Sequence, residues 1–212
     1  MLQVDPGGRG DLLAFAERAV RLDEAAVVRL RNRKDGLLAA WVTTGFEVLA
    51  LRVVPGSVHP ADLTCAADGL IRGLRATGND GVVDPGFPMD SAWRGALPPE
   101  SGFAHVDDVP APVVGDLARQ GVDLAREHGS VHGPPSSLLD QHVLQVSGGG
   151  ATVGVPMRCM LALTAMGFIG DPGGSAGDSD VIRVRATPVW LRIDARFGSV
   201  YRRRGGPGLL LG

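Results

Sequence analysis

The stretch from residue 25 to residue 54 reads AAVVRLRNRKDGLLAAWVTTGFEVLALRVV and predicts three consecutive antiparallel strands. In Ala25–Asn32, apolar residues alternate with arginines, which is typical of a strand with one buried face. The turn signal at residues 34–36 leads into a second strand, Leu37–Thr43. The third strand, Phe46–Val54, is apolar on both faces, so we expect it inside the sheet rather than at its edge.

Helical periodicity appears on both sides of these strands. Asp11–Leu22 predicts a first helix, and Pro60–Ala76 predicts a second with apolar residues at i, i+3, i+4, i+7 and i+8. Asp108 resembles an N-cap, and the helix that it would open runs to about Glu127. Pro156 opens a further helix to Met166, which is apolar nearly all round and is therefore expected to be buried.

The predicted helix after Asp108 carries two glycines. Gly115 and Gly121 each weaken it by roughly 1 kcal/mol relative to alanine, so we expect packing or a close backbone approach to compensate. Four of its residues are expected to face the core: Val113, Leu117, Leu124 and Ala125.

The remaining segments are more irregular. His142–Val146 and Ala151–Val155 predict a hairpin, and Val181–Ile193 predicts one long strand with a bulge at a proline. Between the second and third helices, residues 78–103 form a Pro/Gly-rich connection. We expect this connection to pack on the body of the protein through Phe87, Met89 and Trp93, and the alternative is a lid over a site.

Together these elements predict an α+β fold, with a mainly antiparallel sheet and about four helices packed on one side. A chain of 212 residues can bury a core without metal or disulfide support. We expect a single domain over residues 1–212, with a two-lobe division at the 78–104 loop as the alternative.

Composition excludes several classes of protein. Lys34 is the one lysine beside twenty arginines, a bias that a GC-rich genome produces, so the arginine count itself says nothing about function. Cys65 and Cys159 are too far apart for a zinc cluster or a disulfide framework. The first residues lack a basic segment followed by an apolar one, and the longest near-apolar run, Val155–Ile169, is too short for a bilayer. We therefore expect a cytoplasmic protein with no membrane association.

The strongest asymmetry lies between Val181 and Arg204, which holds seven arginines and a single acid, Asp194. If a bulge at Pro188 shifts the alternation of inward and outward side chains, one face of the strand carries its arginines together with a tryptophan. Such a face suits phosphates and bases, and the alternative is a solvated face whose arginines pair with acids on neighbouring strands. The predicted binding residues are Arg183, Arg185, Trp190, Arg192, Arg202, Arg203 and Arg204.

Other motifs carry less information. A winged helix would use the same basic strand, but the helix before it lacks a polar face for reading bases. Residues 173–177 match G-x-S-x-G without the flanking strand and helix that a nucleophile elbow needs. A cluster of potential metal ligands has no recognisable spacing, so we expect neither metal nor cofactor. That cluster comprises Glu127, His128, His132, Asp140 and His142.

From these observations we expect a non-enzymatic binding or regulatory protein that engages an anionic partner, an acidic protein surface or nucleic acid, through the arginine-rich strand. One alternative is a small hydrolase with a site under the 78–104 loop, using His105, Asp107 and His142. Another is an assembly protein, for instance a homodimer, that docks through its apolar tail, Leu209–Leu211.

Overall fold

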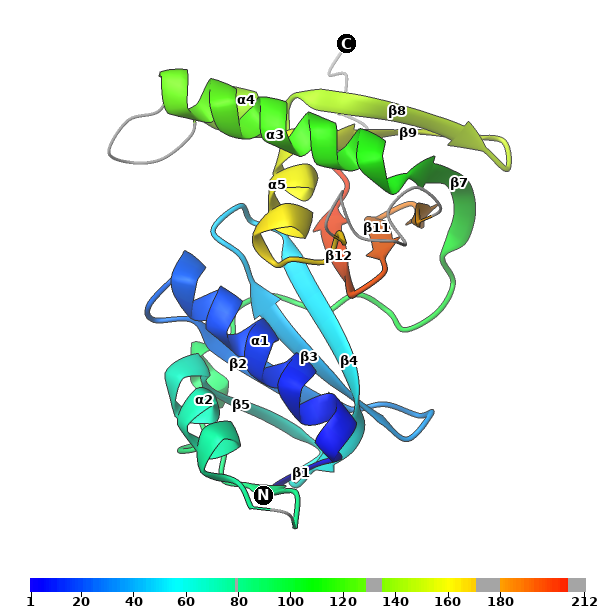
Figure 1. Ribbon diagram of the computed structural model, residues 1–212. Helices are drawn as coiled ribbons and strands as arrows, with labels where there is room; N and C mark the ends of the chain where they lie inside the picture. Colours follow the sequence, from blue (N-terminus) through cyan, green and yellow to red (C-terminus); the bar gives the residue numbers. More distant parts are fainter. Residues whose placement is uncertain (79, 129–134, 171–179, 206–212) are drawn as a thin grey trace. The chain divides into compact units, whose positions relative to one another are not determined.

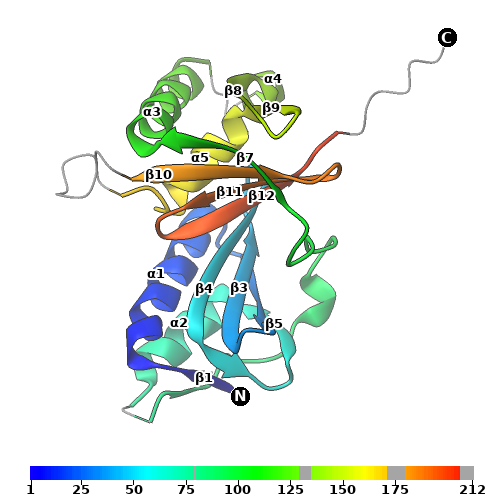
Figure 2. The same ribbon diagram turned by 90° about the vertical axis from the view of Figure 1, so that its right-hand side faces the viewer.

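The computed structural model describes residues 1–78, 80–128, 135–170 and 180–205, with the side chains of residues 125–128 left aside. The chain divides into two compact units, Met1–Ala96 and Leu97–Gly212 (Figure 1). In each unit, helices lie on one face of an antiparallel sheet (Figure 2). The α+β class and the mainly antiparallel sheet are confirmed; the described residues form five α-helices where about four were predicted.

The first unit is a sheet in the order β5-β2-β3-β4, with β1 pairing to both β4 and β6. Helices α1 and α2 pack on one face of it (Figures 1 and 2). The bounds of its elements are β1 Leu2–Val4, α1 Pro6–Leu22, β2 Val27–Asn32, β3 Leu37–Thr43, β4 Leu49–Val58, β5 Asp62–Ala66, α2 Ala67–Ala76, β6 Val82–Val83 and the 3-10 turn η1 Asp90–Ala92.

The sequence pattern placed the centre of this unit correctly. Strand β4 lies between β3 and β1, which confirms its predicted interior position. Helix α1 buries Leu12, Phe15, Ala16 and Ala19 against the sheet, as its periodicity predicted. Burial of such side chains, worth roughly 1.5–3 kcal/mol for each large one, holds the helix in place.

One element of this unit was predicted wrongly. The periodicity of residues 60–76 suggested a single helix, but Asp62–Ala66 is strand β5 and the helix begins only at Ala67. The strand forms because Asp62 lies opposite Arg31 in the β2 ladder and binds the guanidinium of Arg29. This pairing across 33 residues outweighs the local helical preference.

The outer edge of strand β5 is covered by the chain that follows α2. The backbone N–H of Met89 donates to the Thr64 carbonyl at 2.7 Å, and the Thr64 N–H donates to a carboxylate oxygen of Asp90 at 2.7 Å. An isolated bridge between Cys65 and Pro88 extends the contact. Covering an edge in this way satisfies backbone groups that would otherwise recruit another strand.

The second unit is an antiparallel sheet in the order β12-β11-β10-β7, with α3 and α5 on one face (Figure 2). A separate hairpin of β8 and β9 contacts β7. The bounds of its elements are β7 Ala104–Pro110, α3 Ala111–His128, α4 Ser136–Asp140, β8 His142–Gly148, β9 Ala151–Pro156, α5 Met157–Ala165, β10 Val181–Ala186, β11 Trp190–Ala195 and β12 Gly198–Arg203.

The β8–β9 hairpin and the buried helix α5 confirm the predictions, whereas the start and the inner face of α3 differ from them. Asp108 lies within strand β7, so it does not cap the helix. The buried side of α3 is formed by small residues, and the predicted inward residues Val113 and Leu124 are exposed. The small inner face lets α3 approach α5 closely: a Cβ on Gly121 would lie 2.2 Å from the Met157 sulfur.

The predicted long strand over residues 181–193 is two strands joined by a tight turn. Pro188 lies in that turn, which is closed by the N–H of Thr187 donating to the Trp190 carbonyl and by the Thr187 hydroxyl accepting from the Trp190 N–H. Because a turn replaces the predicted bulge, Trp190 is 7% exposed instead of facing solvent. The guanidinium of Arg203 lies 5.3 Å from its ring centroid and covers it.

Candidate functional site

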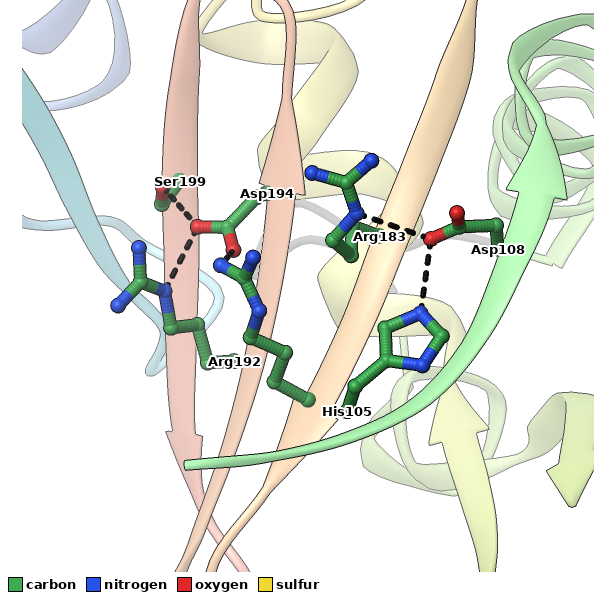
Figure 3. Close-up of polar contacts among 7 residues, drawn as sticks. His105, Asp108, Arg183, Arg192, Asp194 and Ser199 are labelled. Carbon is green, nitrogen blue, oxygen red and sulfur yellow. Dashed lines mark hydrogen bonds and ion pairs between the residues drawn. The ribbon is translucent and has the colours of Figure 1, made fainter. Parts of the chain in front are cut away.

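The face of the β12-β11-β10-β7 sheet that carries the arginines is the region from which a site was predicted, and Figure 3 shows its polar contacts. On the β7 side, Arg183 and Asp108 face each other in the ladder, and the Arg183 Nε donates to an Asp108 carboxylate oxygen at 3.1 Å. The His105 Nε2 lies 3.0 Å from the same oxygen. The hydrogen bond from His105, followed by that from Arg183, holds the pKa of Asp108 below its usual value.

On the β12 side, one carboxylate holds two arginines. Asp194 accepts hydrogen bonds from Arg185, from the Arg192 Nε at 2.7 Å and from the Ser199 hydroxyl at 2.6 Å (Figure 3). Arg192 also lies 5.4 Å from the ring centroid of Tyr201. Because Arg185 and Arg192 are opposite each other in the β10–β11 ladder, the shared Asp194 carboxylate offsets the repulsion between two neighbouring cations.

The three arginines at the end of β12 point to different partners. The Arg202 Nη2 donates to an Asp140 carboxylate oxygen at 2.8 Å, and Arg203 covers Trp190. The Arg204 Nη1 donates to the carbonyl of Thr187 at 2.9 Å. All seven predicted binding residues are therefore engaged within their own unit, and ligand binding by them stays a prediction.

An ion cluster around a buried arginine of this unit was not foreseen from the sequence. Arg158 on α5 is 4% exposed, and its Nε and Nη2 donate to one Asp140 oxygen at 3.1 and 2.7 Å. Arg202 reaches the same oxygen. The Arg158 hydrogen bond is the main reason why the pKa of Asp140 is lowered. A buried arginine in an apolar helix is a signal that a nearby acid is needed, but the sequence does not say which one.

The two histidines of the hydrolase alternative do not lie together in the structure. His105 lies near the tip of the β8–β9 hairpin, because a Cβ on Gly149 would meet the His105 carbonyl oxygen at 3.4 Å. His142 begins strand β8 at the other end of the hairpin, about 20 Å away at the usual rise of a strand. Both histidines are exposed at these separate ends of the hairpin.

The other minor candidates can be placed only in part. Among the described residues, no three His, Cys, Asp or Glu side chains gather closely enough to hold a metal ion. His132, the G-x-S-x-G match at residues 173–177 and the tail Leu209–Leu211 lie outside the described residues, as do the side chains of Glu127 and His128. None of the helices in the described ranges is long and apolar enough to cross a membrane.

The first unit has a polar cleft of about 230 Å³ beside strand β5. Its centre is a bidentate ion pair in which the Arg29 Nε and Nη2 each donate to Asp62 at 2.7 Å. This hydrogen-bonded pairing raises the pKa of Arg29 and lowers that of Asp62. The Trp93 ring stacks on Arg29 at 5.7 Å, and Asp90 completes the lining. The sequence did not indicate this cleft, because residues 60–66 read as helix.

Two domain families match the sequence in tandem. The family described as Domain of unknown function (DUF8010) matches residues 1–95, and that described as Domain of unknown function (DUF8185) matches residues 98–207. None of the curated proteins matches the chain.

Solved structures with the same fold are DNA polymerase sliding clamps. The clamp of Caulobacter crescentus has a TM-score of 0.56 at 14% identity, covering 98% of this chain and 66% of the clamp. A putative DNA polymerase III beta subunit from Eubacterium rectale has 0.57 at 12%, covering 99% and 66%. The beta subunit of Thermotoga maritima has 0.54 at 13%, covering 98% and 66%. This chain thus has the sliding-clamp fold and spans about two thirds of the length of those proteins.

The fold corrects the function expected from the sequence. A binding protein built around an arginine-rich strand is the wrong description, because nearly the whole chain follows a sliding-clamp fold in which that strand is one of several sheet strands. The physical reason lies in the strands themselves: Arg183 is paired with Asp108, Arg185 and Arg192 with Asp194, and Arg202 with Asp140. Since the match to residues 98–207 covers more than half of the 212 residues, the protein belongs to the DUF8185 family.

Proposed function

We propose that this protein is a clamp-like protein that assembles with copies of itself around DNA in the cytoplasm. The observation that carries the proposal is the fold likeness to DNA polymerase sliding clamps over 98–99% of the chain, since a likeness of that extent involves both units. The chain spans 66% of the length of those clamps, and contacts between copies are the part of the proposal that would close it around a duplex.

The charge of the protein favours encirclement of DNA over binding by electrostatic attraction to its phosphates. The net charge is −2 and the isoelectric point is about 6.2, so its electrostatic attraction to phosphates is weak. Arg183, Arg185, Arg192 and Arg202 are held by carboxylates of their own unit, and Arg204 donates to a carbonyl of that unit. A protein of this kind stays on DNA when the DNA cannot slip out, and its retention depends little on salt.

The test separates enclosure from adhesion. A tagged copy is recovered from its own cells with covalently closed circular plasmid, and the bound plasmid is then linearised. We expect the circular plasmid to be retained through a salt wash and to be released when it is cut. Recovery of no plasmid, or equal retention of linear and circular DNA that is lost with salt, would contradict the proposal.

A further inference from the structure

The polar cleft of the first unit lies on the face of the sheet that points away from the helices. Arg29 of β2 and Thr64 of β5 are opposite each other in the ladder and form the floor of the cleft. Side chains alternate across a strand, so the neighbouring Val28 and Cys65, both 0% exposed, point to the other face, on which α1 and α2 lie (Figure 2). Two polar side chains from adjacent strands are therefore held side by side on a rigid support.

The segment that follows α2 forms the wall of the cleft. A carboxylate oxygen of Asp90 accepts the N–H of Thr64 at 2.7 Å, which ties the wall to the floor. The indole N–H of Trp93 donates to the Gly95 carbonyl at 3.2 Å and holds the ring beside Arg29. The lining of the cleft is thus fixed by hydrogen bonds within the unit.

Only part of this segment packs on the body of the unit through side chains. Trp93 does so against Arg29, as the sequence predicted. Phe87 and Met89 are 89% and 39% exposed, which corrects the prediction that their side chains also hold the segment in place. The segment is held instead through the backbone of Met89 and the carboxylate of Asp90.

Three groups in the cleft have hydrogen-bonding capacity that the described part of the chain does not use. Thr64 is 1% exposed, and its hydroxyl makes no hydrogen bond to another described residue. Arg29 donates from Nε and Nη2 to Asp62, whereas its Nη1 has no partner among the described residues. Asp90 accepts the Thr64 N–H through one oxygen and keeps the other for a ligand. Because a buried hydroxyl left unpaired is costly, the cleft is suited to a polar molecule that would pair with it.

The charges around the cleft indicate which class of molecule fits. The pKa of Arg29 is raised by its hydrogen bond to Asp62 and, through space, by the charges of Asp62 and Asp90. No ion pair joins Arg29 to Asp90 in the described ranges, so a cation and an anion border the same cleft without contacting each other. Asp90 would repel an anion and Arg29 would repel a cation, whereas a molecule that carries both charges complements both. The volume of about 230 Å³ limits that molecule to a small one.

We propose that this cleft binds a free α-amino acid. The carboxylate of the ligand accepts hydrogen bonds from the Arg29 Nη1 and the Thr64 hydroxyl, and its ammonium group donates to Asp90. The ring of Trp93 borders the ligand side chain. Since every residue that lines the cleft belongs to the first unit, the site is independent of the clamp-like function proposed above.

Isothermal titration calorimetry of the full chain with each of the twenty protein amino acids tests the site. At least one is expected to bind with a dissociation constant of about 1 mM or lower. Capped forms of that amino acid test the two charges separately, because the N-acetyl form lacks the ammonium group and the methyl ester lacks the carboxylate. Each capped form is expected to bind about tenfold or more weakly, as the loss of a hydrogen bond between charged groups predicts.

Two variants test the assigned residues. Thr64→Val removes the hydroxyl with little change in shape, and Asp90→Asn removes the charge but keeps an oxygen that can accept the Thr64 N–H. Each is expected to weaken binding about tenfold or more. Asp84→Asn is the matched control, because Asp84 also accepts a backbone N–H in the same segment, that of Gly86 at 2.9 Å, but does not line the cleft. The control should bind like the wild type.

Several results would overturn the proposal. These are no binding of any of the twenty amino acids, equal binding of the capped forms, or an unchanged affinity in Thr64→Val or Asp90→Asn. Guanosine is titrated in parallel, because an uncharged base also has donor and acceptor edges. Binding of guanosine in place of an amino acid would assign the cleft to a base and refute the zwitterion.

Discussion

Replacing Asp140 with asparagine tests the ion cluster around the buried Arg158 of the second unit. The change removes the charge that two donors of Arg158, at 3.1 and 2.7 Å, bind in the wild type, and leaves a guanidinium that is 4% exposed without that carboxylate. Breaking a fully buried pair costs about 3–5 kcal/mol. Asp140 is itself 50% exposed, so water compensates in part, and we expect a loss of about 2 kcal/mol in the free energy of unfolding.

Chemical denaturation followed by circular dichroism measures this loss, and thermal unfolding should shift down by roughly 4–8 °C for a chain of this length. The matched control is Asp116→Asn, because Asp116 pairs with Arg119 where both side chains are more than half exposed. The control should cost less than about 0.5 kcal/mol. Adding Arg158→Met to the Asp140→Asn variant should recover part of the stability, since no buried charge then remains. Equal effects of the two asparagine variants would refute the reasoning.

Three further outcomes are expected. The methyl group added by Gly121→Ala meets α5, so this variant should lower the free energy of unfolding by about 1–3 kcal/mol. Gly115 has open space around it, so Gly115→Ala should raise the free energy of unfolding by up to about 1 kcal/mol in the same denaturation assay. The pKa of Asp108 is lowered in the folded state, so the stability that its carboxylate contributes is present above the unfolded-state pKa and is lost as the pH falls through the folded-state pKa. Asp108→Asn should therefore make the free energy of unfolding fall less steeply in acid. An unchanged fall would argue against the pairing of Asp108 with His105 and Arg183. Burial raises the pKa of the Cys65 and Cys159 thiols to about 12, so neither should react with a thiol reagent at neutral pH until the protein is unfolded, and rapid labelling of the native protein would contradict their burial.

The parts of the fold that could be predicted are those in which local pattern and tertiary packing agree. Alternation identified β2, and the turn signal at residues 34–36 preceded β3. Helical periodicity identified α1, and a nearly all-apolar run after Pro156 identified α5. The segment Asp62–Ala66 failed because Leu63 suits the buried side of a helix and of a strand alike. The strand is decided by the Arg29–Asp62 pair, which joins positions 33 residues apart and leaves no trace in a local window.

The candidate site was harder to predict, because the state of each arginine depends on strand register. The sequence shows that Arg183, Arg185 and Arg192 lie in strands, but not that Asp108 and Asp194 lie beside them. A three-residue turn in place of a one-residue bulge was enough to move Trp190 from the surface to the interior. The exposure of Phe87 likewise follows from hydrogen bonds to β5 that composition does not reveal.

The double role of Asp194 has a consequence for substitutions at this position of the chain. A codon usage that places many arginines on the surface favours non-specific binding to polyanions. Here the Asp194 carboxylate forms ion pairs with the guanidinium groups of both Arg185 and Arg192, so its loss does more than remove a hydrogen bond. We expect a substitution at this position to release two adjacent guanidinium groups at once and to raise the affinity for nucleic acid at low salt. The expected harm from replacing Asp194 is thus a new affinity for nucleic acid rather than a lost contact.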